Sequence, residues 1–365
     1  MMPPAVRPGG HPRLRLAGLR RMFGGQPAVD GVDLDVAAGE TVALLGPSGC
    51  GKSTTLNMIV GLEQPDGGDI QIDGRSVLGV PPGRRGVGLV FQDYAVFPHM
   101  TVRQNLGYGL RIRGMARREV ARAVDGAADL LDLRPVLDAR PAALGGSQLQ
   151  RVAIGRTLVT RPAILLLDEP LSNLEAGMRQ AMRATLRRLQ SETGQTIVYV
   201  THDQVEALSL AHRIAVMQAG RIRQCAPTAE IYAQPGHRFV GGFIGAPPMS
   251  FLDGHVSADG AALEADGIVL PLPAPAPPGA AVTFGLRPED VSLEDGPRAV
   301  PATVALLERR GPDAVATLQA GRARLRALVP ADAALRPGDP VRLQACRGTL
   351  FDRDSGLRLL PEAAE

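Results

Sequence analysis

The sequence predicts an α/β domain built on a parallel sheet, followed by a small all-β domain. Short apolar runs at residues 41–45, 164–167 and 197–200 suit strands that are buried on both faces. Helical stretches lie between these runs, and such alternation is typical of a parallel sheet. Beyond about residue 236 the alternation stops. Short strand-like runs separated by proline and glycine then indicate a second domain made of strands.

The first elements of the chain also read as strands. From Leu14 to Glu40 the pattern is β-like, and apolar residues at 32, 34 and 36 alternate with aspartates as in a half-buried strand. Residues 88–91 form a further short apolar run. After Ala176 the spacing becomes helical, because one apolar stripe is surrounded by arginines. The stripe consists of Met178, Met182, Leu186 and Leu189.

Breaker residues set the expected domain boundaries. Pro235 and Gly236 are followed by a second breaker-rich stretch at 245–248, and strand-like runs resume at 282–286 and 325–329. We therefore expect a disordered tail at 1–13, a first domain at 14–235, a linker at 236–250 and the β domain at 251–365.

Composition narrows the function classes. The 365 residues are 45% hydrophobic and 21% charged, which excludes wholesale disorder. Aromatic residues make up 3%, without tryptophan, and the net charge is +3, so we expect no nucleic-acid partner. The cysteines at 50, 225 and 346 are too far apart for a zinc site or a disulfide framework. The sequence contains no run of 18 apolar residues, so it predicts no membrane span.

Lys52 is the only lysine among the 40 basic residues. A mutational bias toward arginine codons explains the imbalance without any functional meaning. Under such a bias, a lysine that persists indicates a position where a compact ammonium is required and a planar guanidinium does not fit.

This lysine lies in the pattern Gly-x-x-x-x-Gly-Lys-Ser of a phosphate-binding loop, between a predicted buried strand and a predicted helix. Glycines let backbone N–H groups converge on phosphate oxygens, and the helix N-terminus adds positive charge. We expect Lys52 to reach the β- and γ-phosphates and the Ser53 hydroxyl to hold Mg²⁺. A glycine-rich turn with a stray lysine is the plainer alternative, which the strand and helix context disfavours. The expected binding residues are Gly46, Pro47, Ser48, Gly49, Cys50, Gly51, Lys52, Ser53 and Thr54.

Polar residues follow three other predicted strands. Asp168 and Glu169 come after a buried run, where Asp168 is placed to order Mg²⁺ and Glu169 to polarise an attacking water. His202 follows the run at 197–200 and suits a γ-phosphate sensor. Gln92 follows the run at 88–91 and suits a bridge between Mg²⁺ and water. Each is a weak signal alone, because a carboxylate pair after a strand is often only a helix cap and a lone histidine is usually structural.

Residues 144–151, Leu-Gly-Gly-Ser-Gln-Leu-Gln-Arg, resemble the signature motif of ABC-transporter ATPases. Together with Lys52, Gln92, Asp168, Glu169 and His202 in order, they make the chain similar to an ABC ATP-binding subunit over about residues 14–365. The resemblance implies an ABC-type P-loop ATPase domain with a helical subdomain at about 94–160, followed by an OB-like (TOBE) regulatory domain. It also implies ATP and Mg²⁺ as cofactors.

Further segments resemble the branch that imports sugars and glycerol-3-phosphate, the maltose-type importers. They are residues 91–100, 108–115, 243–252, 285–289 and 350–352. Importer ATPases for polyamines, iron and phosphonates share much of this pattern, so these solutes remain alternatives. A soluble ABC ATPase acting on ribosomes or DNA is disfavoured, because the chain has one cassette and no long coiled-coil insert.

The resemblance also implies an assembly. Family members form a head-to-tail dimer, in which each ATP contacts the phosphate loop of one subunit and the signature helix of the other. Two transmembrane permease subunits bind this dimer at the cytoplasmic face of the inner membrane, and a solute-binding protein delivers the solute. Phe23 matches the aromatic residue that stacks on adenine. The signature residues expected at the ATP are Gly145, Gly146, Ser147 and Gln148.

Two segments depart from the family pattern. The family reads Leu-Ser-Gly-Gly-Gln where this chain has Gly145 and Ser147, and Asp where it has Glu175. Ser147 either caps the signature helix or crowds the phosphate across the interface. We therefore expect intact ATP binding, and a partner subunit with impaired turnover remains an alternative to a working motor.

Overall fold

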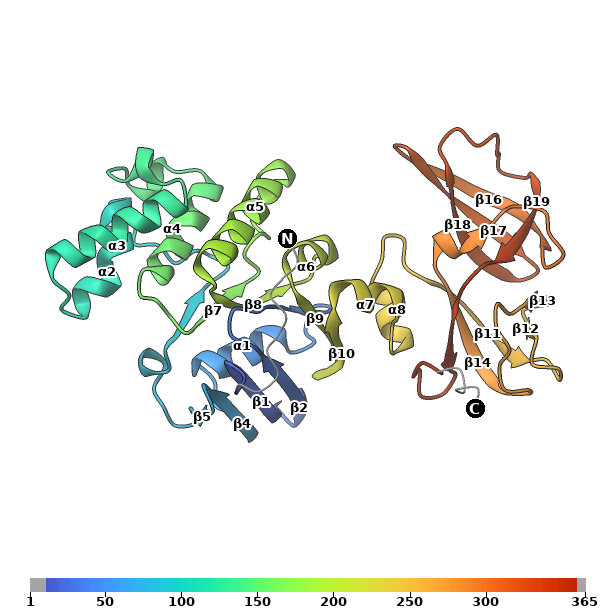
Figure 1. Ribbon diagram of the computed structural model, residues 1–365, viewed down its shortest axis with the longest axis horizontal. Coiled ribbons are helices and arrows are strands. Elements are labelled where there is room, and N and C mark those ends of the chain that lie inside the picture. The colour runs from blue at the N-terminus through green and yellow to red at the C-terminus, as the bar shows by residue number, and fades with distance from the viewer. Residues whose placement is uncertain (1–10, 360–365) are drawn as a thin grey trace. The chain divides into compact units, whose positions relative to one another are not determined.

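The computed structural model describes residues 11–359 and divides into two units, with the second beginning at Ala229 (Figure 1). Of the expected tail at 1–13, residues 1–10 lie outside the described residues. Arg13 is ordered and pairs with Asp73, with 2.8 Å between the guanidinium and the carboxylate.

A six-stranded sheet in the order β10-β9-β3-β8-β7-β6 forms the centre of the first unit. Five of its strands are parallel, and β10 runs antiparallel to β9. Short runs of valine, leucine and isoleucine form these strands because both faces are covered. The strands are β3 (Thr41–Leu45), β6 (Val87–Val90), β7 (Ile164–Asp168), β8 (Thr196–Thr201), β9 (Arg213–Gln218) and β10 (Arg221–Pro227).

The β-like stretch at the start of the chain forms a separate antiparallel sheet in the order β2-β1-β4-β5. Its apolar face joins the core of the parallel sheet, as the burial of Leu34 and Val36 shows. It brings the start of β2 against the loop that follows β3. The strands are β1 (Leu14–Phe23), β2 (Gln26–Val36), β4 (Gly67–Ile72) and β5 (Arg75–Ser76).

Helices cover the parallel sheet and form a cluster at one end of the unit (Figure 1). The clustered helices are α2 (Val102–Ile112), α3 (Arg117–Leu130) and α4 (Gly146–Leu158), within the range 94–160 expected for a helical subdomain. The others are α1 (Lys52–Val60), α5 (Ala176–Thr193) and α6 (Gln204–Leu210). The described residues contain no helix that is long and apolar enough to cross a bilayer.

The apolar stripe predicted for α5 is shorter than expected. Met182, Leu186 and Leu189 are buried, whereas Met178 is 38% exposed. Met178 lies in the first turn of α5, which follows a polar loop at the edge of the sheet, so it does not reach the core.

A buried arginine closes the C-terminal end of α1. Arg85 is 3% exposed and donates to the carbonyls of Met58 and Ile59 at 2.8 and 3.1 Å, and to that of Val80 at 2.8 Å. Carbonyls at a helix end lack intrahelical partners and carry partial negative charge, so the guanidinium satisfies both needs. Burial lowers the pKa of Arg85. Because α1 carries the predicted phosphate loop at its other end, Arg85 fixes the direction of this helix.

The second unit begins with α7 (Thr228–Ala233) and α8 (Arg238–Phe243), followed by strands in two antiparallel sheets. One sheet has β11 (Ser250–Val256), β12 (Ala262–Ala265), β13 (Ile268–Pro271), β14 (Ala281–Leu286) and β20 (Thr349–Asp352). The other has β15 (Val291–Ser292), β16 (Val300–Arg310), β17 (Asp313–Ala320), β18 (Ala323–Pro330) and β19 (Pro340–Ala345). A shared apolar core joins the two sheets.

The linker expected at 236–250 differs from what is observed. It contains α8, and the second unit begins at Ala229 rather than at residue 251. Buried Arg287 explains the difference, because its guanidinium donates to the carbonyls of Tyr232 and Ile244 and fixes this segment on the β domain. The prolines and glycines of residues 236–250 did not indicate that this stretch packs against the β domain.

We expect Arg85→Met to destabilise the first unit by about 2–4 kcal/mol, because three buried carbonyls lose their donor. The measurement is the urea midpoint, followed by circular dichroism at neutral pH. Arg84→Met is the matched control, since Arg84 is exposed and precedes Arg85 directly. Equal midpoints for the two variants would show that the cap contributes nothing.

Candidate functional site

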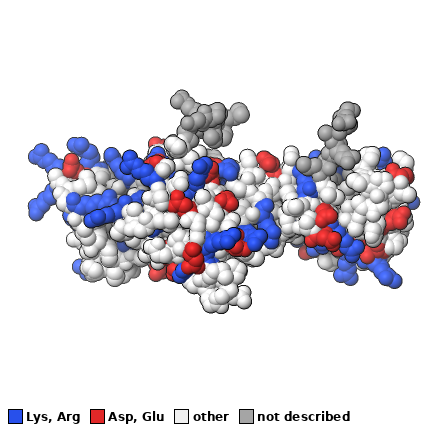
Figure 2. Space-filling view, turned by 90° about the horizontal axis from the view of Figure 1, so that it is seen from below, with Lys and Arg blue, Asp and Glu red and all other residues white. Residues whose placement is uncertain are grey.

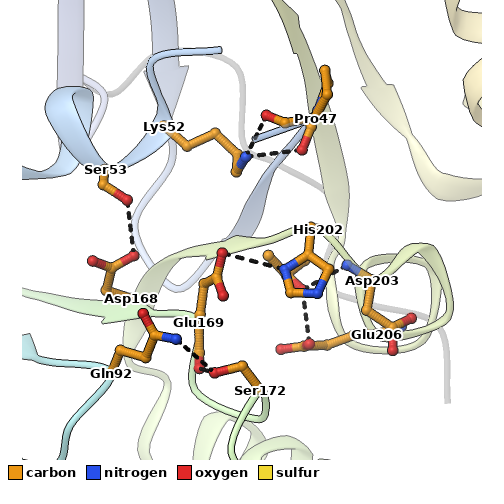
Figure 3. Close-up of polar contacts among 12 residues, drawn as sticks. Pro47, Lys52, Ser53, Gln92, Asp168, Glu169, Ser172, His202, Asp203 and Glu206 are labelled. Atoms are coloured by element: carbon orange, nitrogen blue, oxygen red, sulfur yellow. Dashed lines mark hydrogen bonds and ion pairs between the residues drawn. The ribbon is translucent and has the colours of Figure 1, made fainter. Parts of the chain in front are cut away.

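Polar residues that follow four neighbouring parallel strands meet at one edge of the sheet (Figure 3). Lys52 follows β3, His202 follows β8, Asp168 and Glu169 end β7, and Gln92 follows β6. Because β3, β8, β7 and β6 are adjacent, their carboxyl ends lie side by side. The structure therefore brings together the five residues that the sequence singled out after these strands.

The loop between β3 and α1 is packed so tightly that glycine is required at two positions. A Cβ atom on Gly46 would lie 2.4 Å from the Met217 carbonyl oxygen, and one on Gly51 would lie 2.3 Å from that of Ala28. Gly51 also has φ of 104°, a left-handed conformation that disfavours side chains. Its position before α1 leaves the first N–H groups of the helix without a side-chain cap, as an anion site at a helix N-terminus requires.

Lys52 supplies a buried positive charge to this loop. The residue is 6% exposed, and its Nζ donates to the carbonyls of Gly46 at 2.8 Å and Pro47 at 2.9 Å. Within residues 11–359 it forms no ion pair with a carboxylate. A buried cation without a carboxylate favours an anionic ligand strongly. The loop tip at 47–49 is exposed, and Ser53 and Thr54 lie in the first turn of α1 behind it.

Ser53 and Asp168 face each other across the site, with 3.3 Å between Oγ and Oδ1. Burial raises the pKa of Asp168, and the neighbouring charge of Glu169 adds to this, while Ser53 opposes it. Hydroxyl and carboxylate oxygens suit Mg²⁺, which takes few protein ligands when phosphate oxygens and water supply the rest. These two residues fit the predicted metal position.

Glu169 is held against His202 in a strained conformation. Its Oε1 lies 3.2 Å from His202 Nδ1, and its side chain is 23% exposed against 58% for the histidine. The backbone has φ of 44°, which is unfavourable for a residue with a side chain. A hydrogen bond from its N–H to the Val200 carbonyl, and two that its own carbonyl accepts from Ser172, hold this geometry.

Gln92 is joined to the segment after β7. Its side-chain amide donates to Ser172 Oγ at 3.3 Å, and its backbone carbonyl accepts from the Asn173 amide at 2.9 Å. Ser172 in turn donates to the Glu169 carbonyl. The sequence analysis missed Ser172 and Asn173, although two polar residues four and five positions past the end of β7 were a usable signal.

A local network orders the loop that carries His202. Thr201 Oγ1 donates to Glu206 Oε2 at 2.8 Å and accepts from the Asp203 N–H at 3.0 Å. Asp203 caps α6 by accepting from two backbone N–H groups of the first turn. His202 therefore extends toward Glu169 from a backbone that is fixed on both sides (Figure 3).

Glu206 is the functional residue that sequence reasoning missed most completely. It is 3% exposed, and its Oε1 has no hydrogen-bond partner in the described structure. Burial raises its pKa to about 7; nearby Asp203 and Glu169 add to the increase, while Thr201 and Arg183 oppose it. The spacing Asp203-x-x-Glu206 indicates a helix start, but it carries no signal of burial.

The remaining predicted residues lie apart from this edge within the same unit. Phe23 is 45% exposed at the end of β1, with Arg21 4.7 Å from its ring centroid. Residues 145–148 lie at the start of α4, and no hydrogen bond joins them to the phosphate loop in the described residues.

The structure overturns one suggested role for Ser147. Gly145 is the N-cap of α4, and Ser147 is the second residue of the helix, so Ser147 is not the cap. Gln148 closes this turn by accepting from the Gly145 N–H at 3.1 Å. A Cβ atom on Gly145 would meet nothing within 4 Å, so this position has room for the serine that it lacks.

Comparison with known families agrees with this geometry. Residues 29–172 match the ABC transporter family, residues 245–291 match the MalK OB fold domain, and residues 284–350 match the TOBE domain. The chain is 43% identical to the sn-glycerol-3-phosphate import ATP-binding protein UgpC of Yersinia pseudotuberculosis, over 95% of this chain and 99% of that one. The chain belongs to the ABC transporter ATP-binding proteins.

Other relatives of this ABC subunit are similar over much of its length. It is 46% identical to sn-glycerol-3-phosphate import ATP-binding protein UgpC 1 of Rhizobium johnstonii, over 82% of each chain. Among solved structures it resembles cbiO1 of Clostridium perfringens, part of the ABC transporter complex cbiONQ, with a TM-score of 0.58 at 28% identity. That match covers 61% of this chain and 92% of the other.

A second structure shows a nucleotide on this fold. The ATP-binding cassette MJ0796, solved as a dimer in a post-hydrolysis state bound to ADP and phosphate, has a TM-score of 0.53 at 29% identity. The match covers 59% of this chain and 98% of that one. The chain is thus an ABC-type ATPase, with an ATP-binding domain followed by an OB/TOBE β domain.

We expect Glu206→Gln to make the stability of the protein less dependent on pH. The native carboxyl stays protonated up to a pKa of about 7, while the unfolded one ionises near 4.5. Stability due to this group therefore falls as pH rises from 4.5 to 7 and is constant above, a loss of about 3 kcal/mol in total. Glu206→Gln has no ionisable group at this position, so its free energy of unfolding should not show this loss.

The measurement is the urea midpoint of both proteins between pH 5 and pH 8. Relative to the natural protein, the free energy of unfolding of the variant should rise as pH rises toward 7. Above that pH the difference between the two proteins should stay constant. Exposed Glu192→Gln is the control for loss of a carboxylate elsewhere. A difference between Glu206→Gln and the natural protein that does not vary with pH would contradict the assignment.

Proposed function

We propose that this chain energises solute import, and that its solute is sn-glycerol-3-phosphate or a sugar. The observation that carries the choice of solute is the near full-length similarity to sn-glycerol-3-phosphate import proteins, which includes the C-terminal β domain. Polyamines, iron and phosphonates are the competing solutes. The solute pathway belongs to other chains, so the test must measure transport.

The proposed chemistry uses the residues at the sheet edge. The ATP β- and γ-phosphates bind at the N-terminus of α1, where Lys52 neutralises their charge. Mg²⁺, held by Ser53, Asp168 and Gln92, would offset the charge that develops on the phosphates during hydrolysis. Glu169 polarises the attacking water, and His202 orients Glu169 and the γ-phosphate from the adjacent strand.

The proposed assembly is a head-to-tail homodimer. Each ATP then lies between the phosphate loop of one subunit and residues 145–148 of the other, with Phe23 against the adenine. Two permease subunits and, indirectly, a solute-binding protein complete the importer. The chain would act as a peripheral subunit on the cytoplasmic face of the inner membrane.

We expect Glu169→Gln to lower the rate of ATP hydrolysis at least about 100-fold while ATP binding is retained, because the amide cannot accept a proton from water. Steady-state phosphate release and ATP titration measure the two properties. Glu192→Gln makes the same chemical change at an exposed position of α5, outside the site. Similar losses in both variants would contradict the role given to Glu169.

The same pair tests import. In cells lacking the chromosomal copy, the natural chain should restore uptake of labelled sn-glycerol-3-phosphate, and Glu169→Gln should not. Restored uptake of maltose, a polyamine, iron or a phosphonate instead would transfer the proposal to that solute. No restored uptake despite normal ATP hydrolysis would reject the import function itself.

The rearranged signature is expected to reduce turnover rather than binding. Ser147 adds a side chain in the first turn of α4, where close approach of backbone N–H groups to the γ-phosphate is needed. We expect the double variant Gly145→Ser with Ser147→Gly to raise kcat roughly 3–10-fold, with an unchanged Kd for ATP.

The room around Gly145 makes this repair structurally mild. The single change Gly145→Ser is the control, because it restores the hydroxyl and keeps the side chain at 147. An unchanged kcat in the double variant would show that the rearrangement is tolerated. Activity found only in the double variant would favour a turnover-impaired partner subunit.

A further inference from the structure

A cleft lies between α5 and α6, the two helices that follow β7 and β8 in the first unit (Figure 1). It has a volume of about 380 Å³, and we call it the α5–α6 cleft. Small-molecule sites are commonly cavities of about 300–1,000 Å³ that combine an apolar lining with a few polar groups. The apolar part of this lining consists of Leu167, Leu186, Ile197, Tyr199 and Leu210.

Thr41, the first residue of β3, contributes a buried hydroxyl to the α5–α6 cleft. The residue is 4% exposed, and its Oγ1 forms no hydrogen bond in the described structure. Buried hydroxyls are nearly always paired, because an unpaired one loses its bond to water without compensation. Since Thr41 lines the cleft, a ligand bound there would supply the missing partner.

His212 contributes a second donor beside this hydroxyl. Its Nδ1 accepts a hydrogen bond from the Thr41 backbone N–H at 2.9 Å, and its own backbone N–H donates to the Thr41 carbonyl at 2.8 Å. A neutral imidazole whose Nδ1 accepts carries its hydrogen on Nε2. Within residues 11–359 this Nε2 forms no hydrogen bond, and His212 lines the cleft.

Arg187 contributes a positive charge at the rim of the α5–α6 cleft. Its Nε donates to the Ser209 carbonyl at 2.8 Å, which joins α5 to α6. In the described part of the chain its guanidinium forms no ion pair, whereas the neighbouring Arg188 pairs with Asp132 at 3.0 Å. On the face that Figure 2 shows, acidic side chains lie beside many of the basic ones. By contrast, no aspartate or glutamate among the described residues lines the cleft.

We propose that the α5–α6 cleft binds a small organic monoanion, in which a carboxylate is attached to an aromatic or branched apolar body. The carboxylate accepts hydrogen bonds from Arg187, His212 and Thr41, and the apolar body covers the apolar lining. Arginine forms strong charge-assisted hydrogen bonds with carboxylates. One unpaired cation matches a single negative charge, whereas a phosphate ester would bring nearly two.

This cleft is separate from the candidate ATP site. Thr41 and His212 lie at the amino ends of β3 and β9, whereas the phosphate loop follows the carboxyl end of β3. The length of β3 places the two ends about 13 Å apart. We therefore expect the monoanion and ATP to bind at the same time. The inference goes beyond the proposed function and does not depend on it.

The test is titration of the full purified chain with 2-naphthoate, followed by the anisotropy of the fluorescence of the naphthoate. The chain contains no tryptophan that would interfere. We expect saturable binding with a Kd below about 1 mM, equal with and without ADP and Mg²⁺. The neutral 2-naphthamide has nearly the same shape and should bind at least about 10-fold more weakly, because its NH₂ group meets the donors of the cleft.

Three variants locate the bound probe. Arg187→Met should raise the Kd for 2-naphthoate roughly 10-fold or more, because the charge-assisted bonds are lost. Thr41→Val keeps the shape of the side chain and should raise the Kd roughly 10-fold, while the urea midpoint does not fall because the hydroxyl has no partner in the protein. Exposed Arg75→Met removes the same charge elsewhere in the unit and should bind normally.

Four results would overturn the proposal. No saturable binding below about 1 mM would reject the α5–α6 cleft as a site for this class of ligand. A Kd that rises when ADP is present would place the probe at the ATP site. Equal binding of 2-naphthamide would remove the role of charge, and an unchanged Kd in both Arg187→Met and Thr41→Val would place the probe elsewhere. Because none of these measurements uses hydrolysis or transport, failure of the import function would leave them unaffected.

Discussion

Close backbone packing around the phosphate loop is the constraint on which the candidate site at the sheet edge depends. The carbonyls of Ala28 and Met217 approach so closely that Gly51 and Gly46 cannot carry side chains. These contacts tie the loop to β2 and β9, and Arg85 ties the far end of α1 to the segment before β6. A loop held at both ends can point its N–H groups at one place. The buried ammonium of Lys52 then makes that place favourable for an anion.

The strained backbone of Glu169 is stabilised by its neighbours on the sheet. Glu169 keeps a left-handed backbone because its N–H donates to β8 and its carbonyl accepts hydrogen bonds from the segment after β7. The neighbouring His202 is fixed in turn by the Thr201–Glu206 network. The protonation of Glu206 is therefore part of the support of this site, although the residue does not touch the sheet edge itself. Geometry at Glu169 therefore depends on β7, β8 and the segments that follow them, not on one motif.

Much of the fold and of this edge could be predicted from the sequence, because both depend on local patterns. Apolar runs gave the parallel strands, and polar residues after them gave the site, since carboxyl ends of adjacent strands meet. What failed depends on tertiary contacts. No local sequence pattern indicates that Glu206 is buried or that residues 236–250 pack against Arg287. Met178 fits the helical stripe, yet it lies beyond the core that the stripe faces.

The departure at 145 and 147 shows why a fold can tolerate change at a functional motif. Gln148 caps the first turn of α4 through the backbone N–H of Gly145, so the cap uses no side chain from position 145 or 147, and open space surrounds Gly145. Exchanging glycine and serine there costs the fold little, so stability does not select the order of these residues. Only a ligand or a second subunit that approaches this turn can distinguish the two orders. We therefore expect the exchange to affect closure and turnover only, and we expect the phosphate loop, whose glycines the fold itself requires, to keep its binding role.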